Sequence, residues 1–407
     1  MKNIVRETEI LLPDVEDMGA WAVIACDQYT SNPEYWKTLE KTVGDKPSAL
    51  NVVLPEIYLD GTESERITKI NANIDKYLSD GTLKALKKGM ILTVRSTPFV
   101  KRRIGIICAV DLEEYDYSPA AKLPIRATEG TIEERIPPRI KIRENASAEF
   151  PHIMMLIDDE KRAVIEKVYE KRGKLEKLYD FDLNMGGGHI EGYFIKNCLP
   201  IKRGIAGLLN KKRLTAKYGT DDKFLIAVGD GNHSLATAKV LWNRVKENLS
   251  AKERKNYPAR FALCEIVNVY DEGIYFLPIH RLVKGVDVTA FLKGLVEIDG
   301  GKTKVIAGND EYIREGKNSL PDGIRAVDGY IKEYIRVHGG EVDYVHGDDE
   351  LKQHVVTDDK AVGIMFDKMD KSELFRYVSA SGALPRKTFS MGESVEKRYY
   401  LEGRKIK

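Results

Sequence analysis

The stretch from Phe224 to Lys239 constrains the fold more than any other part of the sequence. It begins with five apolar residues, 224–228, which predict a short strand buried on both faces. A compact Gly-Asp-Gly-Asn-His-Ser turn follows at 229–234, and apolar residues then recur at helical spacing as far as Leu249. The stretch therefore predicts a strand, a glycine loop and a helix in succession.

Such a loop is suited to binding an anion. Glycines let a ligand approach the backbone closely, and the first turn of a helix presents unpaired amides with a partial positive charge. An N-cap at Asn232 or Ser234 would explain the same residues without any ligand. His233 and Asp230 favour the functional interpretation, because a capped turn requires neither an imidazole nor a carboxylate at its tip. The candidate phosphate-binding residues here are Gly229, Gly231, Asn232 and Ser234.

Length and charge limit the classes of function. At 407 residues the chain is too long for one ordinary core, so we expect two or three modules. A formal net charge of +2 gives no global field to attract nucleic acid or an anionic membrane. No apolar stretch approaches a membrane span, and the charged N-terminus lacks the core of a signal peptide. We expect a cytoplasmic protein whose partners are a small-molecule substrate and a nucleotide.

The order of elements predicts an α/β fold of the mixed α+β kind, with mixed sheets. Residues 51–59 read as a strand, 90–94 with 104–110 as a hairpin, 160–178 as a long charged helix and 395–401 as a closing hairpin. We expect four segments along the chain. They are an α+β region at 1–122, a central region with the site at 123–284, a smaller α/β module at 285–378, and a tail at 379–407 that returns to the core.

A charged, proline-rich segment at 123–140 supplies further candidates. Arg126, Thr128, Glu129, Thr131 and Arg139 alternate hydrogen-bond acceptors with guanidinium groups. This combination is suited to gripping a carboxylate or phosphate beside a base. A surface helix with ion pairs between its own glutamates and arginines is the alternative interpretation.

Three other places contribute candidates for the walls of a pocket. A second glycine loop ends at His189, although hairpin geometry alone would also require its glycines. His280 and Arg281 leave a strand end, where they either face a cleft or pair with carboxylates. Lys387 and Thr388 lie in a turn of the tail that can fold back onto a site.

Several separated pieces of the chain together resemble a bacterial and archaeal family of unknown function, DUF1015. The pieces are Ile125-Arg-Ala-Thr-Glu-Gly-Thr with Arg139, Gly229-Asp-Gly-Asn-His-Ser-Leu-Ala-Thr-Ala, Phe276-Leu-Pro-Ile-His-Arg and Leu384-Pro-Arg-Lys-Thr-Phe. They appear in the family's order and span nearly the whole chain.

The family's central loop usually reads Asp-Gly-His-His-Arg. It is similar to the phosphate-contacting loop of the ParB, sulfiredoxin and free-serine-kinase group, which binds nucleotide phosphates at a helix start. By position Asp230, Gly231 and His233 match, while Asn232 replaces the first histidine and Ser234 replaces the arginine. Losing that arginine removes a bidentate phosphate clamp. The missing charge would then come from Arg126, Arg139 or Arg281.

The resemblance implies a nucleotide-dependent, kinase-like phosphotransferase acting on a small polar metabolite such as serine, with ATP or ADP and Mg²⁺. Loop amides would hold the phosphates, His233 would donate to them, Asp230 would hold Mg²⁺ or orient His233, and Glu129 would be the base. A nucleotide-binding regulator similar to the ParB switch and a metal-dependent hydrolase remain alternatives. DNA binding is less attractive, because we see no convincing helix-turn-helix and no basic face.

Overall fold

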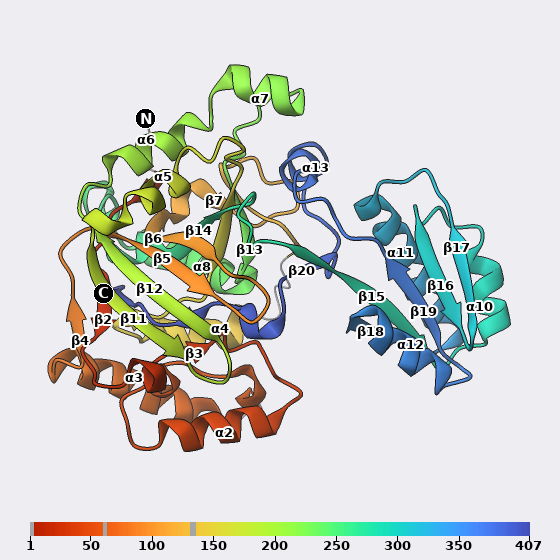
Figure 1. Cartoon of the computed structure of the whole chain (residues 1–407), viewed down its shortest axis with the longest axis horizontal. Coiled ribbons are helices and arrows are strands. Elements are labelled where there is room, and N and C mark those ends of the chain that lie inside the picture. The colour runs from red at the N-terminus through yellow and green to blue at the C-terminus, as the bar shows by residue number, and fades with distance from the viewer. Residues whose placement is uncertain (1–3, 60–62, 131–135) are drawn as a thin grey trace. The chain divides into compact units, whose positions relative to one another are not determined.

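The structure is a computed structural model of the chain, and it describes residues 4–59, 63–130 and 136–407. The chain divides into two units (Figure 1). Unit 1 comprises Met1–Ile274 and the tail Glu393–Lys407, and unit 2 comprises Tyr275–Gly392. The expected module 285–378 lies inside unit 2. The expected segments 1–122 and 123–284 do not form separate sheets, because strands from both pair in one sheet of unit 1.

Unit 1 is built on a ten-stranded mixed sheet in the order β11-β12-β5-β6-β14-β10-β13-β8-β7, with β1 paired to β6. Strands β10 and β13 are antiparallel, whereas β13 and β8 are parallel, which confirms the mixed α/β class. The strands are β1 Val5–Arg6, β5 Met90–Ser96, β6 Arg103–Asp111, β7 Tyr115–Asp116, β8 Ile125–Ala127, β10 Met154–Ile157, β11 Glu176–Leu183, β12 Gly188–Ile195, β13 Ile226–Asp230 and β14 Phe261–Asn268.

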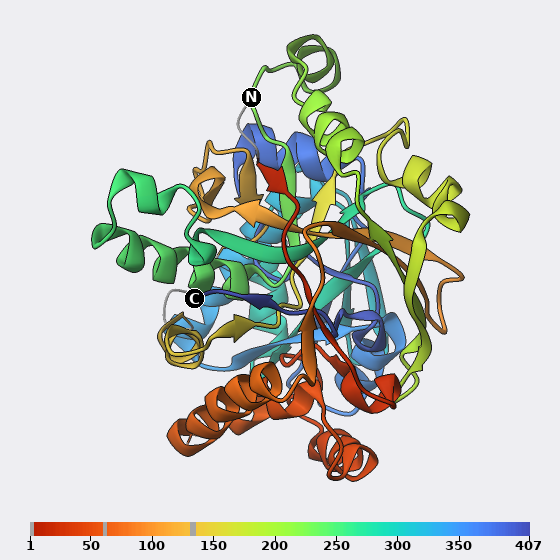
Figure 2. The ribbon, with the colours of Figure 1, turned by 90° about the vertical axis from the view of Figure 1, so that its left-hand side faces the viewer.

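Apolar side chains cover both faces of this sheet, since successive residues of a strand point to opposite faces. Leu92 and Ile106 join one core with Trp242 of α8, and their neighbours Ile91 and Ile107 join the other. The second core includes α2 and α3, the red and orange helices at the bottom of Figure 2. The helices of unit 1 are α1 Met18–Trp21, α2 Pro33–Val43, α3 Glu63–Ser79, α4 Ile136–Glu144, α5 Ile165–Glu170, α6 Leu199–Gly207, α7 Lys211–Tyr218, α8 Asn232–Glu247 and α9 Ala251–Arg254. Among the described residues no helix is both long and apolar enough to cross a membrane.

Three local predictions were wrong. Residues 51–59 form no strand but carry parts of two 3-10 turns, Ala49–Asn51 and Glu56–Tyr58. The helix expected at 160–178 is only Ile165–Glu170, because the chain then turns into β11 and pairs with β12. The closing hairpin is absent from 395–401. Instead β21 (Tyr399–Tyr400) pairs with β3 (Val23–Ile24), and β22 (Arg404–Lys405) pairs with β9 (Ala148–Glu149).

Unit 2 has its own sheet, in the order β17-β16-β19-β15-β18, with β20 paired to β15. Phe291 of α10 and Ile324 of α11 pack in one core, and Leu351 of α12 packs in a second core with Leu282. The elements are β15 Phe276–Lys284, α10 Val288–Leu295, β16 Thr303–Ala307, β17 Asp310–Arg314, α11 Leu320–His338, β18 Glu341–His346, α12 Asp348–Val356, β19 Val362–Phe366, α13 Glu373–Ser381 and β20 Phe389–Met391.

Candidate functional site

The predicted strand, glycine loop and helix are present as β13, Gly231 and α8 (Figure 1). Gly231 has a φ of 77°, and a Cβ atom there would lie 3.0 Å from the Cα of Ile153, so this position requires glycine. Asp230 Oδ1 accepts the amide of Gly231 at 2.9 Å. Gly231, the N-cap residue of α8, has no side chain that could cap the helix, and the buried Oδ1 of Asn232 has no hydrogen-bond partner among the described residues. The first turn of this 16-residue helix presents backbone amides and a partial positive charge.

Two neighbouring strands bring further polar residues to the same edge of the sheet. The hydroxyl of Thr128 donates to the carbonyl of Val228 at 2.6 Å, just beyond the parallel pair Ala127 and Val228. Glu129 follows two residues after the end of β8. The adjacent strand β10 begins opposite Asp230 on its other side.

A cluster of charged residues that the sequence did not single out gathers here. Asp27 follows β3, His152 precedes β10, and Lys397 precedes β21. Burial raises the pKa of Asp27, but the charge of His152, a 3.0 Å hydrogen bond from Gln28 and the charge of Lys397 outweigh it, so the pKa lies below its ordinary value. Lys397 Nζ also lies 3.8 Å from Asp230 Oδ2. One ammonium group thus acts on two carboxylates at the loop.

His152 is held by a buried tyrosine. Its Nδ1 is 2.7 Å from the hydroxyl of Tyr400, which accepts the amide of Cys26 at 3.3 Å. Burial, followed by the charge of Asp27, raises the pKa of Cys26 to about 12. The thiol of Cys26 therefore stays protonated and is not a nucleophile at neutral pH.

Buried arginines fix the segments that carry His152 and Lys397. Arg95 donates to the backbone carbonyls of Val395, Glu396 and Lys397. Arg398 pairs with Glu265 at 3.2 Å and also with Glu402, and it donates to the carbonyl of Pro151, next to His152. These guanidinium groups hold the backbone of two distant segments in place.

A cavity of about 130 Å³ adjoins the loop. Its polar residues include Ser234 of the helix start, together with Arg139 and Glu56, which form an ion pair with each other. The cavity is smaller than the roughly 300–1,000 Å³ typical of complete ligand pockets, so it can hold only part of a ligand. The rest of its wall is mostly apolar, with Val53, Leu54, Ile70, Ile142 and Phe150.

Other predicted residues have partners away from the loop. Arg126 is buried, makes two 2.6 Å hydrogen bonds to Asp222, and donates from Nε to the carbonyl of Leu123. Its charge is therefore neutralised by a carboxylate outside the predicted site. Thr131 lies outside the described residues.

His189 lies on the hairpin of β11 and β12. Its ring nitrogens are 2.6 Å from Asp182 and 2.7 Å from Asp180, and these two hydrogen bonds raise its pKa despite partial burial. Asp180, His189 and Glu191 are close enough together to hold a metal ion. However, Lys177 already lies 4.0 Å or less from both acidic members of that set. An imidazolium between two carboxylates explains this arrangement without a metal.

The candidates in unit 2 are bound within that unit. His280 Nδ1 accepts the amide of Phe366 at 3.3 Å, and its Nε2 is 3.0 Å from Asp348. Arg281 makes five hydrogen bonds, two of them to Asp328 and three to carbonyls. Both side chains pair with carboxylates, which is one of the two alternatives that the sequence left open.

The turn at Lys387 contributes to the same arrangement. The carbonyl of Lys387 accepts from Arg281, while its own side chain is exposed and its φ is 55°. The buried hydroxyl of Thr388 donates to the carbonyl of Pro385 at 2.7 Å. This turn therefore helps to bury Arg281.

Sequence reasoning missed Asp27, His152 and Lys397 because no local motif joins them. The pairings of β21 with β3 and of β10 with β13 bring them to the loop. The one available signal was polar residues directly at strand ends, Asp27 after the apolar run 22–26 and His152 before the run 153–157.

Comparison with known proteins shows a family and no assigned activity. A family model described as "Protein of unknown function (DUF1015)" matches residues 10–369. No curated protein sequence matches the chain.

Several solved structures are similar to the chain at low sequence identity. A conserved hypothetical protein from Pyrococcus furiosus has a TM-score of 0.38 at 11% identity, covering 74% of this chain and 95% of its own. A free serine kinase in complex with AMP has a TM-score of 0.40 at 9% identity, covering 74% and 92%. SbnI with a C-terminal truncation, from Staphylococcus aureus, has a TM-score of 0.37 at 8% identity, covering 70% and 82%. At these scores the likeness carries no argument about ligand or activity.

Proposed function

The chain belongs to the DUF1015 family, and from the geometry of its central loop we propose that it is a nucleotide-dependent phosphotransferase acting on a small polar metabolite. One observation carries the proposal. The first turn of α8 contributes Ser234 to a cavity that Arg139 also lines. Helix amides and a guanidinium group are the donors that a phosphate group prefers.

Positive charge at the loop supports binding of ATP or ADP. Lys397 lies at the loop, and Arg139 lines the cavity beside it, where a bound phosphate would compete with Glu56 for the guanidinium group. Together they would take the place of the arginine that the family's usual loop carries in the position of Ser234. His233, in the first turn of α8, would donate to the phosphates. The small, mostly apolar cavity would take the least polar part of the ligand, and the phosphates would remain at the helix start.

The carboxylates suit a magnesium ion bound together with phosphates. Mg²⁺ prefers oxygen ligands and is usually held by one or two carboxylates plus substrate phosphates. Asp230 would hold it, because its Oδ2 makes only a 3.8 Å contact to Lys397. When bound, the ion would neutralise charge on the transferred phosphoryl group.

Asp27 is our first choice for the base that takes the proton of the acceptor hydroxyl, and Glu129 is the second. Asp27 stays ionised, is oriented by Gln28 and lies beside His152. A carboxylate of low pKa is a weak base, which suffices because phosphoryl transfer depends on positioning and charge more than on deprotonation. Glu129 is a candidate because it follows β8, the strand that pairs with β13, by two residues.

The test uses the full chain with ATP or ADP and a panel of hydroxyl-bearing metabolites that includes serine, and it follows phosphoryl transfer by ³¹P NMR. We expect Asp27→Asn to lower kcat by about 100-fold or more. The exposed Asp45→Asn is the matched control and should leave kcat unchanged. If Glu129→Gln lowers kcat by about 100-fold and Asp27→Asn does not, Glu129 is the base and Asp27 is not.

Two results would reject the proposal. Failure of both nucleotides to bind at millimolar concentration by calorimetry would remove the phosphate site. Nucleotide binding with slow hydrolysis that no acceptor accelerates would instead support a regulatory switch.

A further inference from the structure

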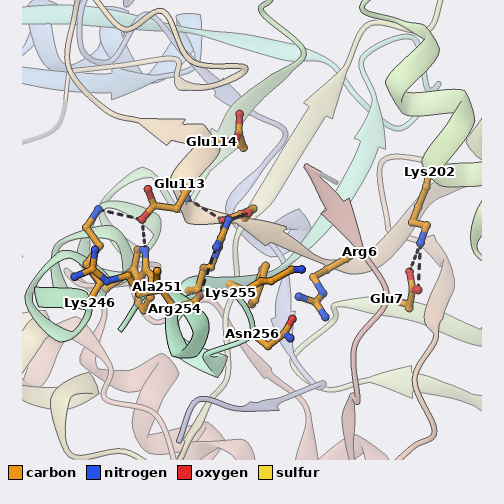
Figure 3. Close-up of a pocket in the computed structure, with 14 residues that line it drawn as sticks. Arg6, Glu7, Glu113, Glu114, Lys202, Lys246, Ala251, Arg254, Lys255 and Asn256 are labelled. Carbon is orange, nitrogen blue, oxygen red and sulfur yellow. Dashed lines mark hydrogen bonds and ion pairs between the residues drawn. The ribbon is translucent and has the colours of Figure 1, made fainter. Parts of the chain in front are cut away.

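Unit 1 contains a second cavity, of about 650 Å³, whose wall includes β1, the far end of α8 and α9 (Figure 3). We propose that this cavity binds a small organic polyanion, a phosphorylated or polycarboxylic metabolite. Its volume falls within the roughly 300–1,000 Å³ of ordinary ligand pockets. Trp242 of its wall is ten residues beyond the start of α8, or about 15 Å along the helix, so the cavity is distinct from the central loop.

Three ion pairs neutralise part of the wall. Lys202 pairs with Glu7 at 2.8 Å, Lys246 with Glu113 at 3.0 Å, and Arg260 with Asp111 at 2.7 Å. Figure 3 shows the first two of these pairs as dashed lines. Because their charges cancel, they shape the wall without selecting a ligand of either sign.

The remaining cations give the cavity a net positive charge. Arg6, Arg254 and Lys255 line it, and none of them forms an ion pair with a carboxylate in the described part of the chain. Among the described residues of the wall, Glu114 is the remaining carboxylate, so the cations outnumber the carboxylates by two. In Figure 3, Arg6 and Lys255 reach into the same part of the cavity. Like charges that share a cavity repel each other, and a bound anion would remove that repulsion.

Arg6 is also held in an orientation that favours a planar or tetrahedral anion. Its guanidinium carbon lies 4.2 Å from the ring centroid of Phe261, which supports the flat face of the group. The N–H groups of a stacked guanidinium point outward in its plane, where they match carboxylate or phosphate oxygens in pairs. The volume of about 650 Å³ limits the ligand to a compact molecule.

The experiment uses the ¹⁵N-labelled full chain and two probes, inorganic pyrophosphate and citrate. The indole of Trp242 donates to Glu113 at the cavity wall, so its N–H resonance reports binding at this place. The other two tryptophans, Trp21 and Trp36, belong to the core on the opposite face of the sheet. We expect saturable binding with a shift of the Trp242 signal. The responding probe identifies the phosphorylated or the carboxylic class.

The variants locate the binding. Arg6→Gln with Lys255→Gln should weaken affinity at least about tenfold, since each charge-assisted hydrogen bond contributes about 1.5–3 kcal/mol. Lys255→Gln alone changes an exposed side chain, so it tests the site even if the double variant fails to fold. Lys252→Gln, an exposed lysine of α9 that does not line the cavity, is the matched control for Lys255, the residue that follows this helix. Arg139→Gln removes charge only at the central loop and should leave the Trp242 shift intact.

The proposal is overturned if neither probe shifts the Trp242 resonance at millimolar concentration. It is equally overturned if Lys255→Gln and the double variant bind as tightly as Lys252→Gln. Neither result depends on phosphotransfer at the central loop.

Discussion

The buried Arg281 of unit 2 differs from the charged residues at the central loop of unit 1 in how closely its partners approach it. In unit 2, Arg281 is fully buried and makes five hydrogen bonds, as many as a guanidinium group can donate. At the central loop of unit 1, Lys397 and Asp230 approach only to 3.8 Å, which is longer than a hydrogen bond. A charge whose bonds are complete inside the protein supports the fold. The charged groups at the loop lie close to one another, and clusters of this kind are frequent at ligand-binding sites.

The largest expected effect concerns Arg281, whose five hydrogen bonds are made within unit 2. Replacing Arg281 by alanine would leave Asp328 and three carbonyls without their donor, and we expect unit 2 to lose about 3 kcal/mol of stability. Hydrogen exchange in peptides of 275–392 measures the loss. Arg325→Ala, which removes an exposed arginine of α11, is the control and should change stability by no more than about 0.5 kcal/mol. Equal protection in both variants would show that the buried network does not support unit 2.

The second prediction concerns the backbone of the loop. Gly231→Ala forces a side chain into the left-handed region and against Ile153, which should cost about 1–2 kcal/mol. Gly207→Ala is the matched control, because no atom lies within 4 Å of its added Cβ. Urea unfolding of both variants measures the difference. If the two glycines behave alike, the turn is not constrained as its geometry indicates.

The third prediction tests the charged residues at the central loop. Lys397→Met should weaken binding of ADP about tenfold, the loss of roughly one charge-assisted hydrogen bond. Because Lys397 lowers the pKa of Asp27, the variant's Asp27 titrates at a higher pH, so activity should begin to fall at a higher pH on acidification. Calorimetry and a pH profile measure the two effects. Lys405→Met, in the exposed part of the same tail, is the control, and an affinity like that of this control would contradict the role of Lys397.

The same contrast explains what the sequence could predict. The apolar run of β13 and the helical spacing of α8 are local patterns, so the loop and its neighbours were expected correctly. The strand predicted at 51–59 is missing because residue types there suit two short turns equally well.

Pairing between strands far apart in the sequence determines the parts of the site that local patterns did not predict. Strands β3 and β21 have two residues each, too few for any periodicity, yet their pairing brings Asp27 and Lys397 to the loop. By contrast, His280 and Arg281 were predicted as site residues from the sequence. The carboxylates that pair with them lie 68 and 47 residues further along the chain, so the sequence did not reveal these pairs. Residue type alone did not tell a saturated charge from one at a binding site.

His189 pairs with carboxylates but is partly exposed, and its substitution has the smallest expected effect. Hydrogen bonds to Asp182 and Asp180 raise the pKa of His189 above its ordinary value of 6.5. The interaction of the protonated imidazole with these carboxylates therefore stabilises the fold below pH 6.5, and this stabilisation is lost as the pH rises through the pKa of His189 in the folded protein. His189→Gln should therefore be less stable than the unchanged protein by under about 1 kcal/mol at acidic pH, with the difference vanishing in alkali. Urea unfolding across the pH range measures it. A metal ligand would behave oppositely, because only neutral imidazole binds zinc, and added zinc would then stabilise the unchanged protein most at high pH.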